Sequence, residues 1–449
     1  MTRKGIMALE ELETAGEVST TGLENVNVEN SFADVTETHR QMERLDRDMD
    51  EAAEVANTLS RVTEQARSSL DEGGLSEAGA RAINVAVEHL MRSVGSSRKL
   101  NPAFEEFKTN GVKHTQLALE GIGDFIKKIL NAIISAVRRV VTWIKSFFVN
   151  TKKLEQDLGE RAGALEKEVK AAHGKNLKED AKIDSVQLIN FLNAKGTGVL
   201  RPDEFSKELD THTKLMRNVL DVVKKFAVTS TECSKKVMES PNADWVSSAM
   251  GEKKKAFSDA TQELLRPFFK SANKYSTHRK DILEKYGNRM IVDEYPLIFN
   301  NSGFFVVSIS SSSNPAGQED FAKVGTFVEK DEGGGFKIES SEVQPLQMSD
   351  AEAVIREVKA NLNAMKTFQT EFKATLSKLE EITEIAEAKL RLGFHIVKGA
   401  EEAASLSYSL TKVASQSTTK GVASLLMYNC GVLKHSLDYV ANSLKLVDA

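Results

Sequence analysis

The chain has 449 residues, which is enough for two or three domains, and its 41% hydrophobic content can form a packed core. Aromatic residues make up only 6% and prolines number only 7, a composition that suits long helices better than β-sandwiches or barrels. Residues 1–35 contain two basic and seven acidic side chains and so account for the whole net charge of −5. The remainder is neutral, which argues against strong nucleic-acid binding, because such binding needs a clustered basic surface.

The first 35 residues are acidic and polar and show no period. We expect a flexible leader there, with a short helix from Leu9 to Leu12. A heptad pattern starts at Gln41 and ends before Gly73 and Gly74, and it predicts a long helix with a narrow apolar seam. The seam positions are Met42, Leu45, Met49, Ala52, Ala56, Leu59, Ala66 and Leu70.

Several further helices are expected downstream of this seam. Ser76 is placed to cap a helix that ends at Gly95. Pro267 should kink or split the last of the helices that follow. Besides a long helix at 121–148, these helices cover Lys152–Ala172, Phe205–Met238 and roughly Asp244–Tyr286.

Residues 287–345 differ in composition, since they contain three of the seven prolines together with several glycines. The apolar runs RMIV, PLIF, FFVVSIS and TFVEK favour short strands. The stretch VEKDEGGGFKI is typical of a hairpin with a glycine-rich turn. We therefore predict a small antiparallel sheet, inserted among helices that cover its apolar face.

A second heptad helix follows, with its main track at Val358, Met365, Phe372, Leu379 and Ala386. Ile355, Leu362 and Leu376 form the other track, with Gln369 and Thr383 as polar breaks. The two heptad helices could pair with each other or with another copy of the chain. Small residues near the C-terminus favour close packing around Leu425, Leu426, Leu433, Leu437 and Val440.

The predicted fold is therefore mainly α: a long-helix bundle with heptad segments and a small inserted antiparallel β-sheet, an α+β arrangement. We expect four parts, namely the leader or propeptide 1–35, a helical domain 36–286, the β insert 287–345 and C-terminal helices 346–449 that pack back on the bundle.

The sequence lacks the usual marks of catalysis or export. Metalloprotease, nucleophile-elbow, P-loop and dinucleotide motifs are missing. The acidic residues around the GGG stretch do not have EF-hand spacing, and a solvated hairpin tip explains them. Cys233 and Cys430 form no disulfide framework, and neither a signal peptide nor an 18-residue apolar run is visible. We expect a non-enzymatic protein with no cofactor and no metal site.

The stretch GIGDFIKKILNAIISAVRRVVTWIKSFF, residues 121–148, has a wide apolar stripe and a cationic face. Two interpretations stay open, because a buried helix of a bundle and a helix that lies in a membrane surface share this pattern. The residues expected to contact a membrane on the second interpretation are Ile122, Phe125, Ile126, Lys127, Lys128, Ile129, Ile133, Arg138, Arg139, Trp143, Ile144 and Phe147.

Three stretches follow one another in the chain: LSEAGARAINVAVEHLM, NPAFEEF and TQLALEGIGDFIKKI…VVTWIKSFF. Their order resembles that in the internal head proteins of large tailed bacteriophages, which belong to the prohead core or inner body. The resemblance covers roughly residues 70–150, with looser similarity to about 240. It implies a structural protein that is made in the host bacterial cytoplasm and packaged inside the phage head with other capsid proteins. Self-association is expected from the heptad helices instead. Ejection with the genome, followed by contact with a membrane surface, is a further implication.

Many such proteins lose an N-terminal propeptide to a prohead protease, which cuts after a Glu that has a selected residue two positions earlier. Ala15-Gly16-Glu17 fits this style, so the resemblance places a cleavage between Glu17 and Val18. The near-neutral body departs from the strongly basic internal proteins that condense DNA. A membrane-active effector or toxin that acts through 121–148 is the alternative function.

Overall fold

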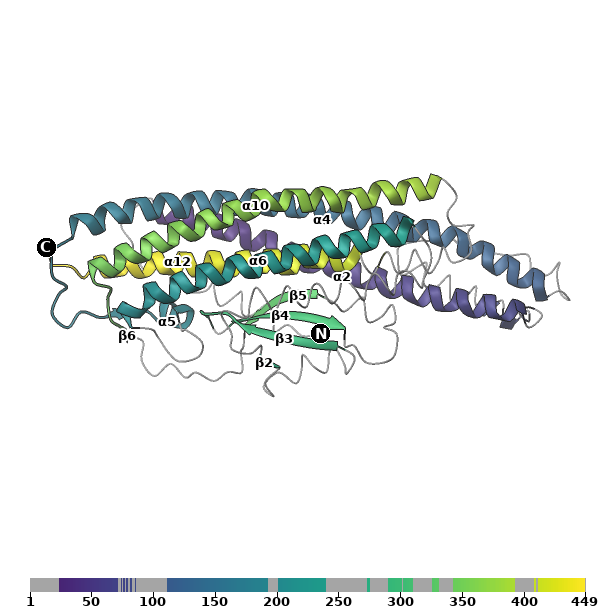
Figure 1. The fold of residues 1–449 in the computed structure, drawn as a ribbon, viewed down its shortest axis with the longest axis horizontal. Helices are drawn as coiled ribbons and strands as arrows, with labels where there is room; N and C mark the ends of the chain where they lie inside the picture. The colour runs from purple at the N-terminus through teal and green to yellow at the C-terminus, as the bar shows by residue number, and fades with distance from the viewer. Residues whose placement is uncertain are drawn as a thin grey trace.

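The computed structural model describes residues 24–71, parts of 74–85, 111–192, 201–239, 273–274, 290–300, 302–309, 325–330, 342–391, 408 and 411–448. In these residues, long helices lie side by side along the longest axis, and a small sheet lies against one side of them (Figure 1). The mainly helical α+β fold predicted from the sequence is confirmed. The helices are α2 (Glu24–Asp71), α4 (Gly111–Ala171), α5 (Val186–Leu192), α6 (Pro202–Glu239), α10 (Met348–Arg391) and α12 (Ser424–Leu444).

Helix α4 is the central element of the bundle. It has 61 residues, a length of about 90 Å at 1.5 Å per residue. It joins the predicted helices 121–148 and Lys152–Ala172 into one, because no proline interrupts the chain between them. Helix α4 packs against α2, α10 and α12, so three other helices depend on its surface.

Helix α10 buries the predicted heptad seam along its whole length. Phe372, Val358 and Ala386 are fully buried, and the polar breaks Gln369 and Thr383 are buried with them. The seam faces α4, α6 and α12. Helix α6 confirms the helix expected at Phe205–Met238 and supplies Phe205, Leu209 and Val219 to the same core.

Helix α2 begins earlier than the sequence predicted. It starts at Glu24, so residues 24–35 of the expected leader are helical rather than part of a flexible segment. Val28 and Val35 are buried and continue the sevenfold spacing of Met42 and Met49. The second track begins at Ser31, which is also buried. Residues 1–23 lie outside the described part of the chain, as does most of the helix expected after Ser76. The predicted cap itself is present, since the Gly79 N–H donates to Ser76 Oγ at 3.1 Å.

The inserted sheet is antiparallel, with strand order β2-β3-β4-β5. Its strands are β2 (Asn273–Lys274), β3 (Met290–Pro296), β4 (Ser302–Ile309) and β5 (Gly325–Lys330). Phe304 and Val306 of β4 join the core of the bundle, and their neighbours Phe305 and Val307 are buried on the other face.

Three details of the β prediction are wrong. The run PLIF does not form a strand beyond Pro296: it turns back through Asn300, whose φ is +57°, into β4. Strand β2 lies in the stretch expected to be helical. Strand β6 (Glu342–Val343) lies within the predicted insert but pairs with β1 (Ile183–Asp184) in a separate two-stranded sheet. Of the predicted hairpin VEKDEGGGFKI, only the part in β5 is described.

A π-helical segment, η4 (Ser417–Ala423), leads directly into α12 and holds the sheet on the bundle. Gly421 makes this contact close, because a Cβ there would lie 2.5 Å from Thr326 Oγ1 on β5 and 2.8 Å from Val223 Cγ1 on α6. Helix α12 is buried on almost every side, and Leu425, Leu426, Leu433, Leu437 and Val440 are all fully buried, as predicted.

Candidate functional site

The amphipathic segment 121–148 forms the middle of α4, and its apolar stripe is covered where its side chains are described. Ile133, Ile144 and Phe147 are fully buried, and Trp143 is 6% exposed. The Trp143 indole N–H donates to the backbone oxygen of Thr38 on α2 at 2.8 Å. In the folded chain this stripe is therefore the contact surface for neighbouring helices. The side chains of Ile122, Phe125, Ile126, Lys128 and Ile129 lie outside the described part.

The cationic face of this segment is matched by acidic residues of α10. Arg138 pairs with Glu387 at 2.6 Å, and Lys145 pairs with Glu380 at 2.8 Å. Arg139 is exposed and Lys127 is partly buried. Helix packing thus accounts for the described apolar side chains of the segment and for two of its basic ones. Contact with a membrane stays a prediction, and among the described helices none has the length and apolarity to cross a membrane.

The predicted cleavage residues Ala15, Glu17 and Val18 lie outside the described part of the chain. Contacts between α2 and α4 are present from Ser31 onward. Ser31 Oγ donates to Asp157 of α4, and Lys153 of α4 pairs with Asp34 at 3.2 Å.

A chain of buried hydrogen bonds joins α6, α10 and α12 inside the bundle. His212 Nε2 lies 2.8 Å from Asn429 Oδ1, and the Asn429 amide donates to Asn361 Oδ1 at 2.7 Å. The Asn361 amide in turn donates to Thr213 Oγ1 at 3.2 Å. All four side chains are buried. Such a network fixes the register of three helices, because any slip would leave buried polar groups unpaired.

His212 is held neutral by its surroundings. Burial lowers its pKa to about 4, and the hydrogen bond to Asn429 opposes that shift only in part. The ring packs edge-on against Phe299 and Tyr428, with centroids 5.5 and 5.6 Å away. Tyr428 accepts from the Phe299 N–H and donates to the Phe299 oxygen, which ties the loop after β3 to α12. The arrangement suits a structural histidine better than a proton-transfer group.

A charged cluster links α2, α4 and α12. Arg161, only 5% exposed, pairs with Asp438 at 2.7 Å, and Lys434 pairs with both Asp438 and Glu29. Burial alone would raise the pKa of Asp438, but the hydrogen bond from His435 and the charges of Lys434 and Arg161 outweigh it and lower the pKa. The carboxylate therefore stays ionised and holds three helices together.

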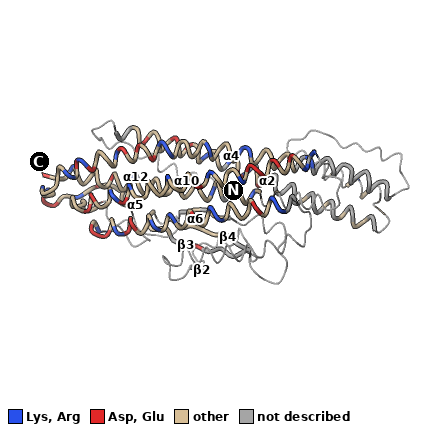
Figure 2. Tube along the Cα trace, turned by 45° about the horizontal axis from the view of Figure 1, so that its top comes forward, with Lys and Arg blue, Asp and Glu red and all other residues tan. Residues whose placement is uncertain are grey.

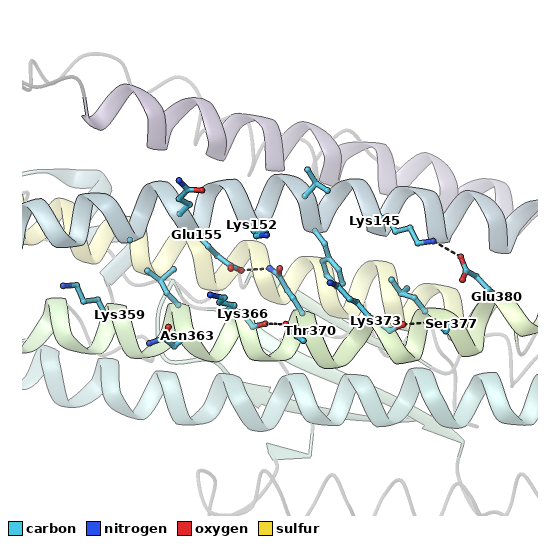
Figure 3. Close-up of a pocket in the computed structure, with 17 residues that line it drawn as sticks. Lys145, Lys152, Glu155, Lys359, Asn363, Lys366, Thr370, Lys373, Ser377 and Glu380 are labelled. Atoms are coloured by element: carbon cyan, nitrogen blue, oxygen red, sulfur yellow. Dashed lines mark hydrogen bonds and ion pairs between the residues drawn. The ribbon is translucent and has the colours of Figure 1, made fainter.

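A groove of about 1000 Å³ lies between α4 and α10 (Figure 3). Phe148, Leu362 and Leu376 contribute apolar surface to it, and Glu155 and Gln369 lie hydrogen-bonded to each other at its centre. Burial raises the pKa of Glu155 to about 7, against the opposing charges of Lys366 and Lys152. Five lysines line the groove: Lys145, Lys152, Lys359, Lys366 and Lys373.

None of these clusters brings together the side chains that a metal centre needs. Among the described residues, no three His, Cys, Asp or Glu side chains are grouped so as to hold a metal ion. Basic and acidic residues are interspersed along the helices rather than gathered on one side (Figure 2). The described surface offers helix packing and ion pairing as its chemistry.

A family model for phiKZ-like phage internal head proteins matches residues 30–442, from the second turn of α2 nearly to the end of α12. The chain belongs to this family. The match confirms the resemblance seen in the sequence, and it places this internal head protein inside the phage head as a structural protein of the virion. No curated protein and no solved structure matches the chain.

Sequence reasoning missed the groove and the buried network. The lysines of α10 recur every seven residues, each three positions before a seam residue, and this spacing could have revealed the groove. The sequence gives no comparable indication of the buried network. Asn361 and Asn429 are each a single polar residue within an apolar pattern, and His212 is far from both in sequence.

Proposed function

We propose that this internal head protein is a non-catalytic structural component, packaged into the head as a preformed helical bundle. One observation supports this most: a single apolar core runs through the helices and the sheet. Residues as distant as Val28, Phe147, Val306 and Leu433 belong to it. A chain with one continuous core of this kind behaves as a rigid body, as a packing component of a crowded head requires.

The same proposal includes removal of the leader by the prohead protease between Glu17 and Val18. The described part of the bundle begins at Glu24 and the family match at residue 30, so the cut would leave both intact. The other partners we propose are capsid or inner-head proteins, and further copies of the chain. Strong binding to DNA is not part of the proposal, since the charges are interspersed along the bundle.

Mass spectrometry of purified particles tests packaging and processing together. The expected result is abundant peptides from 30–442 and a semi-specific N-terminal peptide that starts at Val18. Peptides that start at Met1 or Thr2 in mature particles would overturn the cleavage. Absence of the chain from particles would overturn the whole proposal.

Ejection with the genome is the remaining part of the proposal, and it rests on the resemblance alone. Comparison of full particles with particles that have released their DNA provides the test. If the protein leaves the head, its amount per capsid falls after release. An unchanged amount would show that it stays behind.

A further inference from the structure

The lysines of the groove between α4 and α10 form two regular rows. Lys145 and Lys152 lie seven residues apart on α4, and Lys359, Lys366 and Lys373 repeat at the same interval on α10. Residues seven apart share a helix face, so each helix presents a row of cations along one edge of the groove. Each lysine also precedes a residue of the groove floor by three positions; the floor residues are Phe148, Glu155, Leu362, Gln369 and Leu376.

Three of these lysines form no ion pair in the described part of the chain, although the charges of Lys152 and Lys366 act on Glu155. Lys359 pairs with Glu166 at 2.5 Å and Lys145 with Glu380 at 2.8 Å, both beyond the middle of the groove. Lys152, Lys366 and Lys373 are exposed, and no described carboxylate lies within ion-pair distance of them. The groove therefore combines the apolar side chains of Phe148, Leu362 and Leu376 with three exposed lysines that form no ion pair in the described part of the chain, around a central Glu155–Gln369 pair.

The N-terminal leader of the same chain has the complementary chemistry. Glu10, Glu13 and Glu17 are spaced by three and four residues, the interval that places side chains on one helical face. In a helix, Leu9 and Leu12 would lie beside that acidic face, whereas Ile6 would lie on it, one turn before Glu10. Three carboxylates beside the apolar side chains of Leu9 and Leu12 are complementary to three lysines beside the apolar residues of the groove floor.

We propose that residues 5–17 of the leader dock in the groove between α4 and α10, with the apolar side chains on its floor and the carboxylates against Lys152, Lys366 and Lys373. The leader would then cover this groove for as long as it is attached. This inference does not depend on whether the bond after Glu17 is cut.

The start of α2 lies within reach of the groove. Ser31 bonds to Asp157 of α4, next to Gln156, which lines the groove. With residues 5–17 docked as a helix about 20 Å long, residues 18–23 connect this helix to Glu24 and can span about 20 Å when extended. Attachment to the same chain also raises the local concentration of the leader to the millimolar range, so weak ion pairs suffice for docking.

Nucleic acid is the other polyanion that such lysines could attract. The apolar floor of Phe148, Leu362 and Leu376 argues against it, because a phosphate backbone gains nothing from that surface. The lysine rows also follow the heptad interval of about 10.5 Å along each helix, which suits a third helix.

Lysine acylation followed by mass spectrometry tests the docking. The acylation rates of Lys152, Lys366 and Lys373 should be about fivefold lower in the full chain than in the chain 18–449, as expected for three partly screened ion pairs. Lys207 on α6, exposed and outside the groove, should react equally in both. The protection should weaken at high salt.

A charge-reversed leader, E10K/E13K/E17K, is the matched variant within the full chain. It should lose the protection while keeping the thermal unfolding temperature of the bundle, because the three substitutions lie outside the helices from Glu24 onward that form the described core. Equal acylation rates in the full chain, the 18–449 chain and this variant would overturn the proposal. Protection of the 18–449 chain by a 20-base-pair DNA duplex, with none from the leader, would assign the groove to nucleic acid instead.

Discussion

Helices α10 and α2 both pack on α4 with a heptad spacing, yet they are held by different interactions. The seam of α10 is filled by large apolar side chains such as Met365 and Phe372, with Gln369 as a buried polar exception. The described seam of α2 alternates Val28, Val35 and Met42 with Ser31 and Thr38. Its contacts with α4 include the bonds from Trp143 and from Asn150 to Thr38, each 2.8 Å long.

This difference between the two interfaces suggests that the α10 interface contributes mainly to stability and that the α2 interface mainly fixes the register of the helices. Apolar burial is strong but tolerates small slips along the helix, whereas a hydrogen bond is weaker and holds only at one position. We therefore expect substitutions on the α10 side to change the free energy of unfolding most. Substitutions on the α2 side should have smaller effects.

The largest effect should come from Phe372→Ala. Phe372 is fully buried and packs against Phe148 and Phe368, with centroids 5.9 and 5.3 Å away. Its truncation should lower the free energy of unfolding by about 3–5 kcal/mol. Chemical denaturation provides the measurement, and Lys373→Ala, an exposed neighbour, should cost no more than about 0.5 kcal/mol. A cost below about 1 kcal/mol for Phe372→Ala would mean that the seam is not part of the core.

The buried Glu155–Gln369 pair in the interface between α4 and α10 should make the free energy of unfolding depend on pH. Because the folded pKa of Glu155 is raised to about 7 from 4.5, folding favours its protonated form. The wild-type chain should therefore lose stability from this group as pH rises from 4.5 through 7. Glu155→Gln removes the titration and keeps an acceptor for the Gln369 amide.

The stability of Glu155→Gln relative to wild type should thus increase by about 3 kcal/mol between pH 4.5 and 8. Buried histidines such as His212 titrate alike in both chains and cancel from the difference. Denaturation at several pH values measures it, and a difference that does not change with pH would contradict the raised pKa.

On the α2 side, Trp143→Phe keeps an aromatic ring but removes the N–H that bonds to Thr38. The expected cost is about 1 kcal/mol, for one lost hydrogen bond, because the Thr38 carbonyl keeps its place in the hydrogen-bond ladder of α2. Thermal unfolding followed by circular dichroism would detect it. A loss as large as that of Phe372→Ala would abolish the distinction between the two interfaces.

The smallest effect should come from Lys153→Ala. Its ion pair with Asp34 is 3.2 Å long, and both side chains are more than half exposed. We expect a change below about 0.5 kcal/mol, further reduced by salt. A salt-dependent loss above about 1 kcal/mol would show that surface charge, rather than the seam, holds α2 in place.

The sequence predicted α10 well because large apolar residues occupy its seam at regular intervals. It missed the first turns of α2 because Ser31 and Thr38 interrupt the pattern within an acidic stretch, and only the contact with α4 makes these positions buried. Composition was a poor guide there, since a polar residue whose hydroxyl bonds to its own helix is tolerated inside a bundle.

The arrangement of the candidate sites was harder to predict from the sequence than the helices were. The amphipathic pattern of 121–148 fitted two environments, and only the positions of α2 and α10 show that its described apolar face is covered. The pairing of Ile183 with Val343 joins segments 160 residues apart through two residues each, too short to leave a strand signal. The buried bond between His212 and Asn429 likewise depends on tertiary contacts alone.

The location of the protein in the particle tests the account most directly. Intact purified virions would be treated with an external protease, and the same digestion repeated after the heads are opened. We predict that peptides from 30–442 resist digestion in intact virions and are lost once the heads are open. Digestion of the protein in intact virions, at the rate of exposed tail or capsid-surface proteins, would contradict a structural role inside the head.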